Sequence, residues 1–139
     1  MLNGKKIVVT GCASGIGKEV ARLIKEAGGY VLGVDLSVTD DYVDELYRAD
    51  LSDPESIRDL IHVLPRGIDG LANVAGLPPT KPAAKVLAVN YVGLKALTVG
   101  LVPKMADGAS VVNVASLAGI GWPNMVSSIL ESESLAFGE

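Results

Sequence analysis

The sequence predicts a doubly wound α/β fold, in which helices cover both faces of a parallel sheet. Short apolar runs alternate with segments in which apolar residues recur at helical spacing. A glycine-rich turn joins the first apolar run to the first helix. The composition is 49% apolar but only 4% aromatic, with 16 glycines. Such a composition suits strands of valine, isoleucine and leucine that are joined by tight turns.

The first part of the chain has the pattern of a strand, a helix and a second strand. The apolar run 7–10 predicts a strand that is buried on both faces. Helical spacing follows over 16–27, and two glycines end that helix. The run 30–34 predicts the second strand, which Asp35 closes. A helical crossover of this length joins parallel strands.

The link to the third strand is short, because only 14 residues separate Asp35 from Asp50. We expect an irregular turn around 40–45 and then a short strand ending near Asp50. Ser52 is expected to cap the next helix, with Glu55 completing a capping box and Pro54 in the first turn. That helix should end near residue 64.

In the second half of the chain, the run 71–75 predicts the fourth strand, and three prolines within 77–82 exclude regular structure there. We expect one long buried helix over about 84–105, a turn at 107–108 and a fifth strand at 110–114. A helix over 126–137 is the last expected element. These units give a Rossmann-type sheet with strand order 3-2-1-4-5, incomplete on its C-terminal side.

The turn from Gly11 to Gly17 has the chemistry of a pyrophosphate-binding loop. Glycines let the backbone approach a phosphate closely, and the following helix presents free N–H groups to the anion. Asp35 lies 18 residues after Gly17 at the end of a strand, where a carboxylate can accept hydrogen bonds from the adenosine ribose. Because no basic residue neighbours Asp35, the sequence predicts NAD rather than NADP, and it indicates no metal site.

The spacing Thr-Gly-x-x-x-Gly-x-Gly from Thr10 to Gly17 resembles the short-chain dehydrogenase/reductase family. Further motifs follow in the family's order: Asp50-Leu51, the segment 73–76, Asn90 and the strand that leads to Ser116. The resemblance covers residues 5 to about 121. It implies a dinucleotide-binding portion over 1–121 and the start of an insertion or tail over 122–139. The cofactor-binding residues that it implies are Gly11, Ser14, Gly15, Ile16, Gly17, Asp35, Leu36, Asp50, Leu51, Asn73, Ala75 and Gly76.

The same resemblance assigns Ser116 to the substrate oxygen and Asn90 to a water of the proton relay. In the family, a Tyr-x-x-x-Lys pair follows the Ser, and the Lys lowers the pKa of the phenol so that it can act as acid and base. After Ser116 this chain contains neither Tyr nor Lys. Tyr91 and Lys95 have the required spacing but precede Ser116, so we interpret them as a coincidence.

The resemblance implies an NAD-dependent oxidoreductase that acts on a secondary alcohol or ketone. Residues 11–15, residues 75–77 and the short link after Asp35 resemble the bacterial 3-alpha-hydroxysteroid dehydrogenase/carbonyl reductase branch, which implies a hydroxysteroid substrate. Without the Tyr–Lys pair, the 139-residue chain is expected to be inactive on its own. The alternative is a non-catalytic NAD-binding fragment or interaction module. A truncation, a cleavage product and a complete short protein all remain open.

Charge and cysteine content suggest the partners and the location. The net charge of -4 argues against a nucleic-acid partner. The single cysteine, Cys12, cannot form an internal disulfide, which fits a reducing cytosol, and the N-terminus does not resemble a signal peptide. The apolar stretch 83–102 contains two lysines and is more typical of a soluble helix than of a membrane span. We expect a cytoplasmic homo-oligomer with a small-molecule substrate, in which neither Cys12 nor His62 is catalytic.

Overall fold

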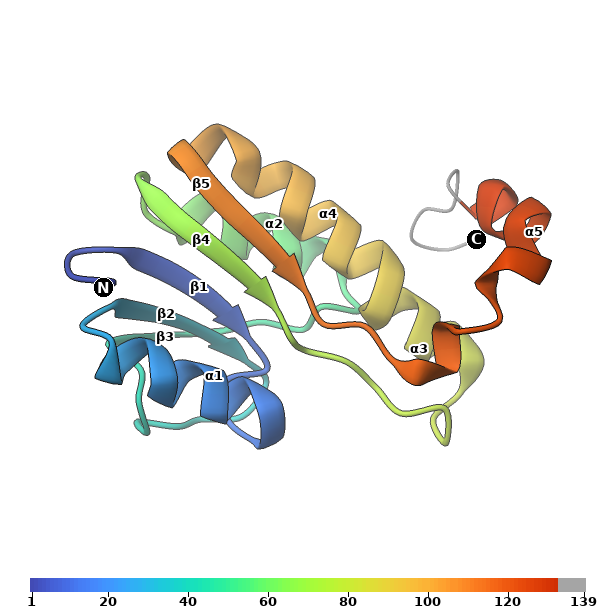
Figure 1. Ribbon diagram of the computed structural model, residues 1–139, viewed down its shortest axis with the longest axis horizontal. Helices are drawn as coiled ribbons and strands as arrows, with labels where there is room; N and C mark the ends of the chain where they lie inside the picture. Colours follow the sequence, from blue (N-terminus) through green and yellow to red (C-terminus); the bar gives the residue numbers. More distant parts are fainter. Residues whose placement is uncertain (133–139) are drawn as a thin grey trace.

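The computed structural model describes residues 1–132 and contains a five-stranded parallel sheet with helices on both faces (Figure 1). The strand order is β3-β2-β1-β4-β5, so the predicted fold class and strand order are confirmed. Because all neighbours pair in parallel, the carboxyl ends of the strands lie along one edge of the sheet. The strands are β1 (Lys6–Thr10), β2 (Tyr30–Asp35), β3 (Glu45–Arg48), β4 (Ile68–Asn73) and β5 (Met105–Asn113).

The two faces of the sheet carry separate apolar cores. α1 (Gly15–Glu26) packs on one face, and α2 (Pro54–Val63) and α4 (Leu94–Leu101) pack on the other (Figure 1). Successive residues of a strand point to opposite faces. Val8 accordingly belongs to the core beneath α2 and α4, whereas Val9 belongs to the core beneath α1. Both are fully buried, which explains why the first apolar run contains no charge.

The predicted bounds of the fourth strand are wrong at both ends, since β4 begins at Ile68 and ends at Asn73. The strand therefore includes a charged residue, Asp69. Its carboxylate accepts hydrogen bonds from the Lys6 backbone N–H at 2.9 Å and from the Lys5 ammonium at 2.8 Å. A contact with the neighbouring strand thus keeps a charged residue within the sheet.

The predicted turn at 107–108 lies within β5, which begins at Met105 rather than Ser110. The pairing shifts from Ile68–Met105 to Gly70–Ser110, so β5 carries extra residues between these two points. Gly108 accommodates the irregularity with a φ of 78°. The glycine therefore marks a bulge in a longer strand and not the end of a connection.

The sequence predicts Ser52 as the cap of α2, but the cap is Asp53. The Asp53 carboxylate accepts a hydrogen bond from the Glu55 backbone N–H at 3.0 Å. The Ser52 hydroxyl instead donates to Asp50 at 2.6 Å. Pro54 occupies the first turn as predicted, because its missing N–H costs nothing there.

The long helix predicted over 84–105 is divided into several segments. α3 (Ala83–Leu87) leads into a π-helical segment (Ala88–Gly93), which is followed by α4 and a 3-10 turn (Val102–Lys104). A Cβ on Gly93 would lie 2.0 Å from the Leu51 carbonyl oxygen, so the helix backbone touches the chain after β3 at this point. In the described part of the chain, one continuous helical segment, Ala83–Lys104, is long enough and apolar enough to cross a membrane. It is buried on the face that carries Leu97 and Leu101 in the core.

The end of the described chain lies beyond the carboxyl end of β5, away from the sheet (Figure 1). Two 3-10 turns, Leu117–Gly119 and Trp122–Met125, lead to α5 (Val126–Ser132). α5 begins where the sequence predicts a helix, and the remainder of that predicted helix lies outside the described residues. β5 is an edge strand whose Val111 and Val112 are 40% and 59% exposed. Because parallel strands are normally covered on both faces, this exposure of β5 is unusual for such a strand.

Candidate cofactor-binding site

A pocket of about 240 Å³ lies at the carboxyl ends of the first two strands and β4. This is the position at which open α/β sheets bind nucleotides, because the chain crosses to opposite faces on either side of β1. The structure brings many of the residues predicted from sequence into its lining: Gly11, Ser14, Asp35, Leu36, Asp50, Leu51, Ala75 and Gly76.

The glycines of the loop after β1 are required by its geometry. Gly11 has a φ of 72°, and a Cβ there would lie 2.9 Å from the Ala75 Cα. At Gly17, a Cβ would lie 2.0 Å from the Gly11 carbonyl oxygen. The first turn of α1 therefore rests directly on the loop. No residue with a side chain could occupy either position without moving the backbone.

The start of α1 offers free backbone donors. Ser14 is the N-cap of this helix, and in the described structure its side chain makes no capping hydrogen bond. Gly15, Ile16 and Gly17, the first three residues of the helix, were predicted to bind the cofactor but lie outside the lining of this pocket. Their N–H groups have no partner within the helix, because the first donors of any helix lack one.

Asp35 connects the end of β2 to the loop. One carboxylate oxygen accepts a hydrogen bond from the Ala13 N–H at 3.0 Å, and the other accepts from the Ser37 N–H at 2.9 Å. These bonds fix the orientation of the carboxylate at the wall of the pocket. Each carboxylate oxygen has two acceptor sites, so Asp35 can still accept from a ligand hydroxyl.

Asp50 lies at another part of the same wall. Its Oδ1 accepts hydrogen bonds from the Ser52 N–H at 2.8 Å and from the Ser52 hydroxyl at 2.6 Å. These bonds lower the pKa of Asp50, and the positive charge of Lys85 lowers it further. Asp50 is thus an ionised acceptor at neutral pH, and both of these bonds fall on its Oδ1.

Thr10, the first residue of the glycine motif, supports the pocket in a way that the motif alone does not predict. Its buried hydroxyl oxygen accepts hydrogen bonds from the N–H groups of Val74 and Ala75, both at 3.0 Å. It thereby joins the carboxyl end of β1 to the segment after β4.

Asn73 lies beneath the pocket, outside its lining. The side chain is only 3% exposed, and its amide donates to the Thr98 hydroxyl at 3.0 Å and to the Asn113 side-chain oxygen at 2.8 Å. Asn73 thus joins β4 to α4 and to the end of β5. Its predicted contact with the cofactor would have to be made through the backbone that it positions.

The two residues assigned to catalysis lie on the same edge of the sheet. The Asn90 side chain binds the Leu77 backbone at two points, accepting from its N–H at 2.7 Å and donating to its carbonyl at 3.0 Å. Leu77 itself lines the pocket. Ser116 follows β5 and is exposed, and its hydroxyl accepts from the Ala118 N–H at 3.2 Å.

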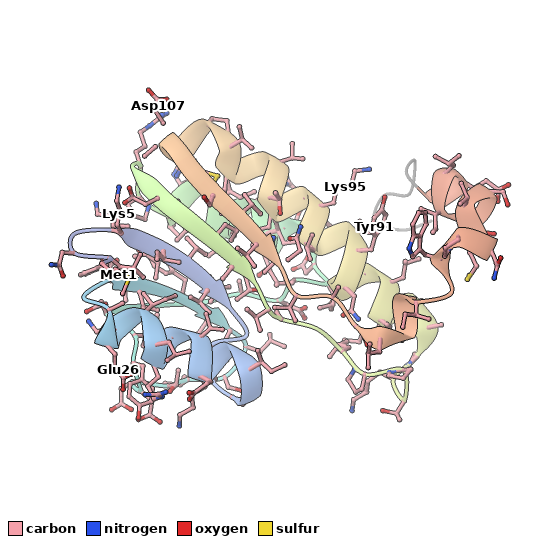
Figure 2. All side chains as sticks on the ribbon, viewed as in Figure 1. Met1, Lys5, Glu26, Tyr91, Lys95 and Asp107 are labelled. Atoms are coloured by element: carbon pink, nitrogen blue, oxygen red, sulfur yellow. The ribbon has the colours of Figure 1, made fainter. Side chains whose placement is uncertain are left out.

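Tyr91 and Lys95 form a pair on the helix surface, with the Lys95 ammonium 5.8 Å from the centre of the Tyr91 ring. Figure 2 shows both side chains directed away from β5. Neither lines the cofactor pocket. His62 lies exposed near the end of α2. Among residues 1–132, no cluster of three or more His, Cys, Asp or Glu side chains could hold a metal ion.

Cys12 is fully buried within the glycine loop. Burial, together with the negative charge of Asp35, raises the pKa of its thiol to about 11. We expect Cys12 to resist iodoacetamide at pH 8 in the native protein and to react fully once the protein is unfolded, because the thiolate is the reactive form. Mass spectrometry of the alkylated protein measures this. Rapid labelling under native conditions would contradict the assignment.

The same shift makes stability dependent on pH. A thiol whose pKa is raised on folding contributes stability below pH 9, its ordinary pKa, and loses that contribution as the pH rises towards 11. The loss is about 2–3 kcal/mol for a shift of this size. Denaturant unfolding between pH 8 and 11 should show a steeper loss of stability in the parent chain than in Cys12→Ala, in which the raised pKa values of Tyr30 and Tyr47 still cause some loss.

Sequence comparisons agree with this geometry. The family profile described as short chain dehydrogenase matches residues 5–127. The coniferyl-alcohol dehydrogenase of Pseudomonas sp. (strain HR199 / DSM 7063) is 48% identical over 122 residues, which cover 88% of this chain and 48% of that protein. The 3-alpha-hydroxysteroid dehydrogenase/carbonyl reductase of Comamonas testosteroni is 36% identical over 107 residues, which cover 73% and 39% respectively. The chain thus spans half or less of the length of these two relatives.

Solved structures share the fold. The 3-alpha-hydroxysteroid dehydrogenase from Pseudomonas sp. B-0831, complexed with NADH, superimposes with a TM-score of 0.74 at 30% identity, over 93% of this chain and 53% of that one. The RhlG/NADP complex of Pseudomonas aeruginosa superimposes with a TM-score of 0.77 at 30% identity, over 86% and 56%. Structures with this fold therefore include complexes with either nicotinamide cofactor.

Proposed function

We propose, since this chain belongs to the short-chain dehydrogenase family, that it forms the cofactor-binding part of an NAD-dependent oxidoreductase. The reaction is hydride transfer between the nicotinamide and a secondary alcohol or ketone. The single observation that carries the proposal is the convergence of the glycine loop, Asp35 and Asp50 on one pocket at the carboxyl edge of the sheet.

The residues around the pocket fit a dinucleotide. The glycine loop leaves room at Gly11 and Gly17 that any Cβ would fill, and the free N–H groups at the start of α1 can bind the pyrophosphate. Asp35 would accept hydrogen bonds from the ribose hydroxyls. Asp50 and Leu51 would lie beside the adenine, with Ala75 and Gly76 beneath the dinucleotide. When bound, NAD supplies the site that accepts or donates the hydride.

NAD is favoured over NADP by the charge at the end of β2. Asp35 lines the pocket, and the next two residues, Leu36 and Ser37, carry no positive charge. A fixed carboxylate would repel a 2′-phosphate on the ribose. The relatives' structures include both cofactors, so this preference rests on the residues of this chain.

The substrate that we propose is an apolar alcohol or ketone, with a hydroxysteroid as the leading example. Ser116 would donate to the substrate oxygen, and Asn90 would hold a water of the proton relay. Beyond Ser116, the large apolar side chains of Leu117, Ile120 and Trp122 are 83%, 74% and 59% exposed. Such side chains suit the wall of an apolar substrate pocket.

A second candidate function is non-catalytic NAD binding. The absence of Tyr and Lys after Ser116 favours it for the 139 residues taken alone. For the whole protein, we also propose a cytoplasmic location and assembly into a homo-oligomer.

Calorimetry with both nucleotides tests the proposal. We expect NAD to bind at least about tenfold more tightly than NADP, a difference equal to about 1.4 kcal/mol. Asp35→Ala should narrow this gap. Asp40→Ala removes the same charge from an exposed position outside the pocket and should leave the gap unchanged. Equal affinities of the parent chain for NAD and NADP would refute the cofactor assignment, and binding of neither would refute the site.

A further inference from the structure

Lys85 of α3 lines the cofactor pocket together with Asp35 and Asp50. Among the described residues that line this pocket, it is the one cationic side chain. None of the sequence motifs includes it, because it lies between the proline-rich loop and Asn90. The fold brings it to the pocket from a helix that the chain reaches only after β4.

Lys85 is an exposed side chain that lines the same pocket as Asp50. Its charge contributes to the lowered pKa of Asp50, and Leu51 and Val89 also line the pocket. Both hydrogen bonds from Ser52 fall on Oδ1 of Asp50, so Oδ2 is available to a ligand. The pocket thus presents a charged donor and a charged acceptor, together with apolar side chains that can contact a flat ring.

We infer that Lys85 and Asp50 together bind the edge of the adenine base, with the Lys85 ammonium donating to a ring nitrogen and the Asp50 carboxylate accepting from the amino group. Adenine carries its amino donor next to ring-nitrogen acceptors, so a donor–acceptor pair matches it. The inference rests on the proposed function. It adds Lys85 as a residue that binds the base and selects for it.

Calorimetry with NAD, AMP and nicotinamide mononucleotide tests the inference on the full chain. Lys85→Gln should weaken NAD and AMP by the same factor, on the order of tenfold, as expected for a charged hydrogen bond. Nicotinamide mononucleotide has no adenine, so its binding should not change. Lys85→Arg keeps the charge and should retain most of the affinity. Lys81→Gln removes an exposed charge outside this pocket and should change nothing.

Two results would overturn the inference while leaving the proposed function intact. One is an unchanged affinity of Lys85→Gln for AMP when the parent chain binds AMP and NAD. The other is an equal loss of affinity for AMP and nicotinamide mononucleotide in Lys85→Gln, which would mean that Lys85 attracts the phosphate and does not bind the base. If the parent chain bound neither AMP nor NAD, the proposed function would fail, and this inference with it.

Discussion

The 139-residue chain should bind NAD and yet produce no NADH at an enzyme-like rate from a hydroxysteroid. No Tyr or Lys follows Ser116 in these residues, so the groups that would move the proton are absent from them. Positioned acid–base catalysis contributes roughly 10²–10⁴-fold to a rate. The rate of NADH formation should therefore be lower by about this factor than in an enzyme that has the Tyr–Lys pair. Absorbance at the NADH band, measured with a hydroxysteroid and with coniferyl alcohol, follows the reaction.

Tyr91→Phe is the matched variant for this experiment. Tyr91 has the right spacing to Lys95, but the two side chains are directed away from β5 and do not line the pocket (Figure 2). Turnover by the parent chain that disappears in Tyr91→Phe would make this pair the acid–base couple. Turnover that survives the substitution would require a different general base.

Gly17→Ala is expected to cost about 3 kcal/mol or more of folding stability, at the high end of single substitutions. The new Cβ would lie 2.0 Å from the Gly11 carbonyl oxygen. Both partners are backbone, so α1 would have to separate from the loop, and nucleotide binding should be lost with it. Denaturant unfolding measures the first effect and calorimetry the second.

Gly119→Ala is the control for that substitution. A Cβ there meets nothing within 4 Å, and its φ lies outside the left-handed region. The free energy of unfolding should change by less than about 1 kcal/mol, and a small gain is expected because alanine restricts the unfolded chain. Equal stabilities of the two variants would contradict the proposed packing of α1 on the loop.

The parts of the molecule that could be predicted from the sequence are those that local chemistry decides. The strand order followed from successive βα units, and the glycine loop and Asp35 belong to one short βαβ segment. Contacts between distant segments decided the rest. Asp69 is held in β4 by Lys5 and Lys6, and the helix after α3 widens into a π turn where Gly93 touches the Leu51 carbonyl.

The site shows the same division. The roles of Thr10 and Lys85 could not be predicted from the sequence, because they depend on neighbours about 65 and 35 residues away, Ala75 and Asp50 respectively. Asn73 has the expected identity, but its side chain is used within the core, between β4, α4 and the end of β5. A motif predicts which residue is needed, whereas the partners of its side chain depend on the whole fold.

The two hydrogen bonds between Asn90 and Leu77 restrict what Asn90 can offer to a reaction. The oxygen and the nitrogen of its amide each bond to the Leu77 backbone, so the side chain holds the loop at Leu77 at a fixed distance from the π segment. An asparagine suits this position because its amide places an acceptor and a donor side by side, opposite the Leu77 N–H and carbonyl. A carboxylate here would keep the acceptor but lose the donor, so the Leu77 carbonyl would lose its partner.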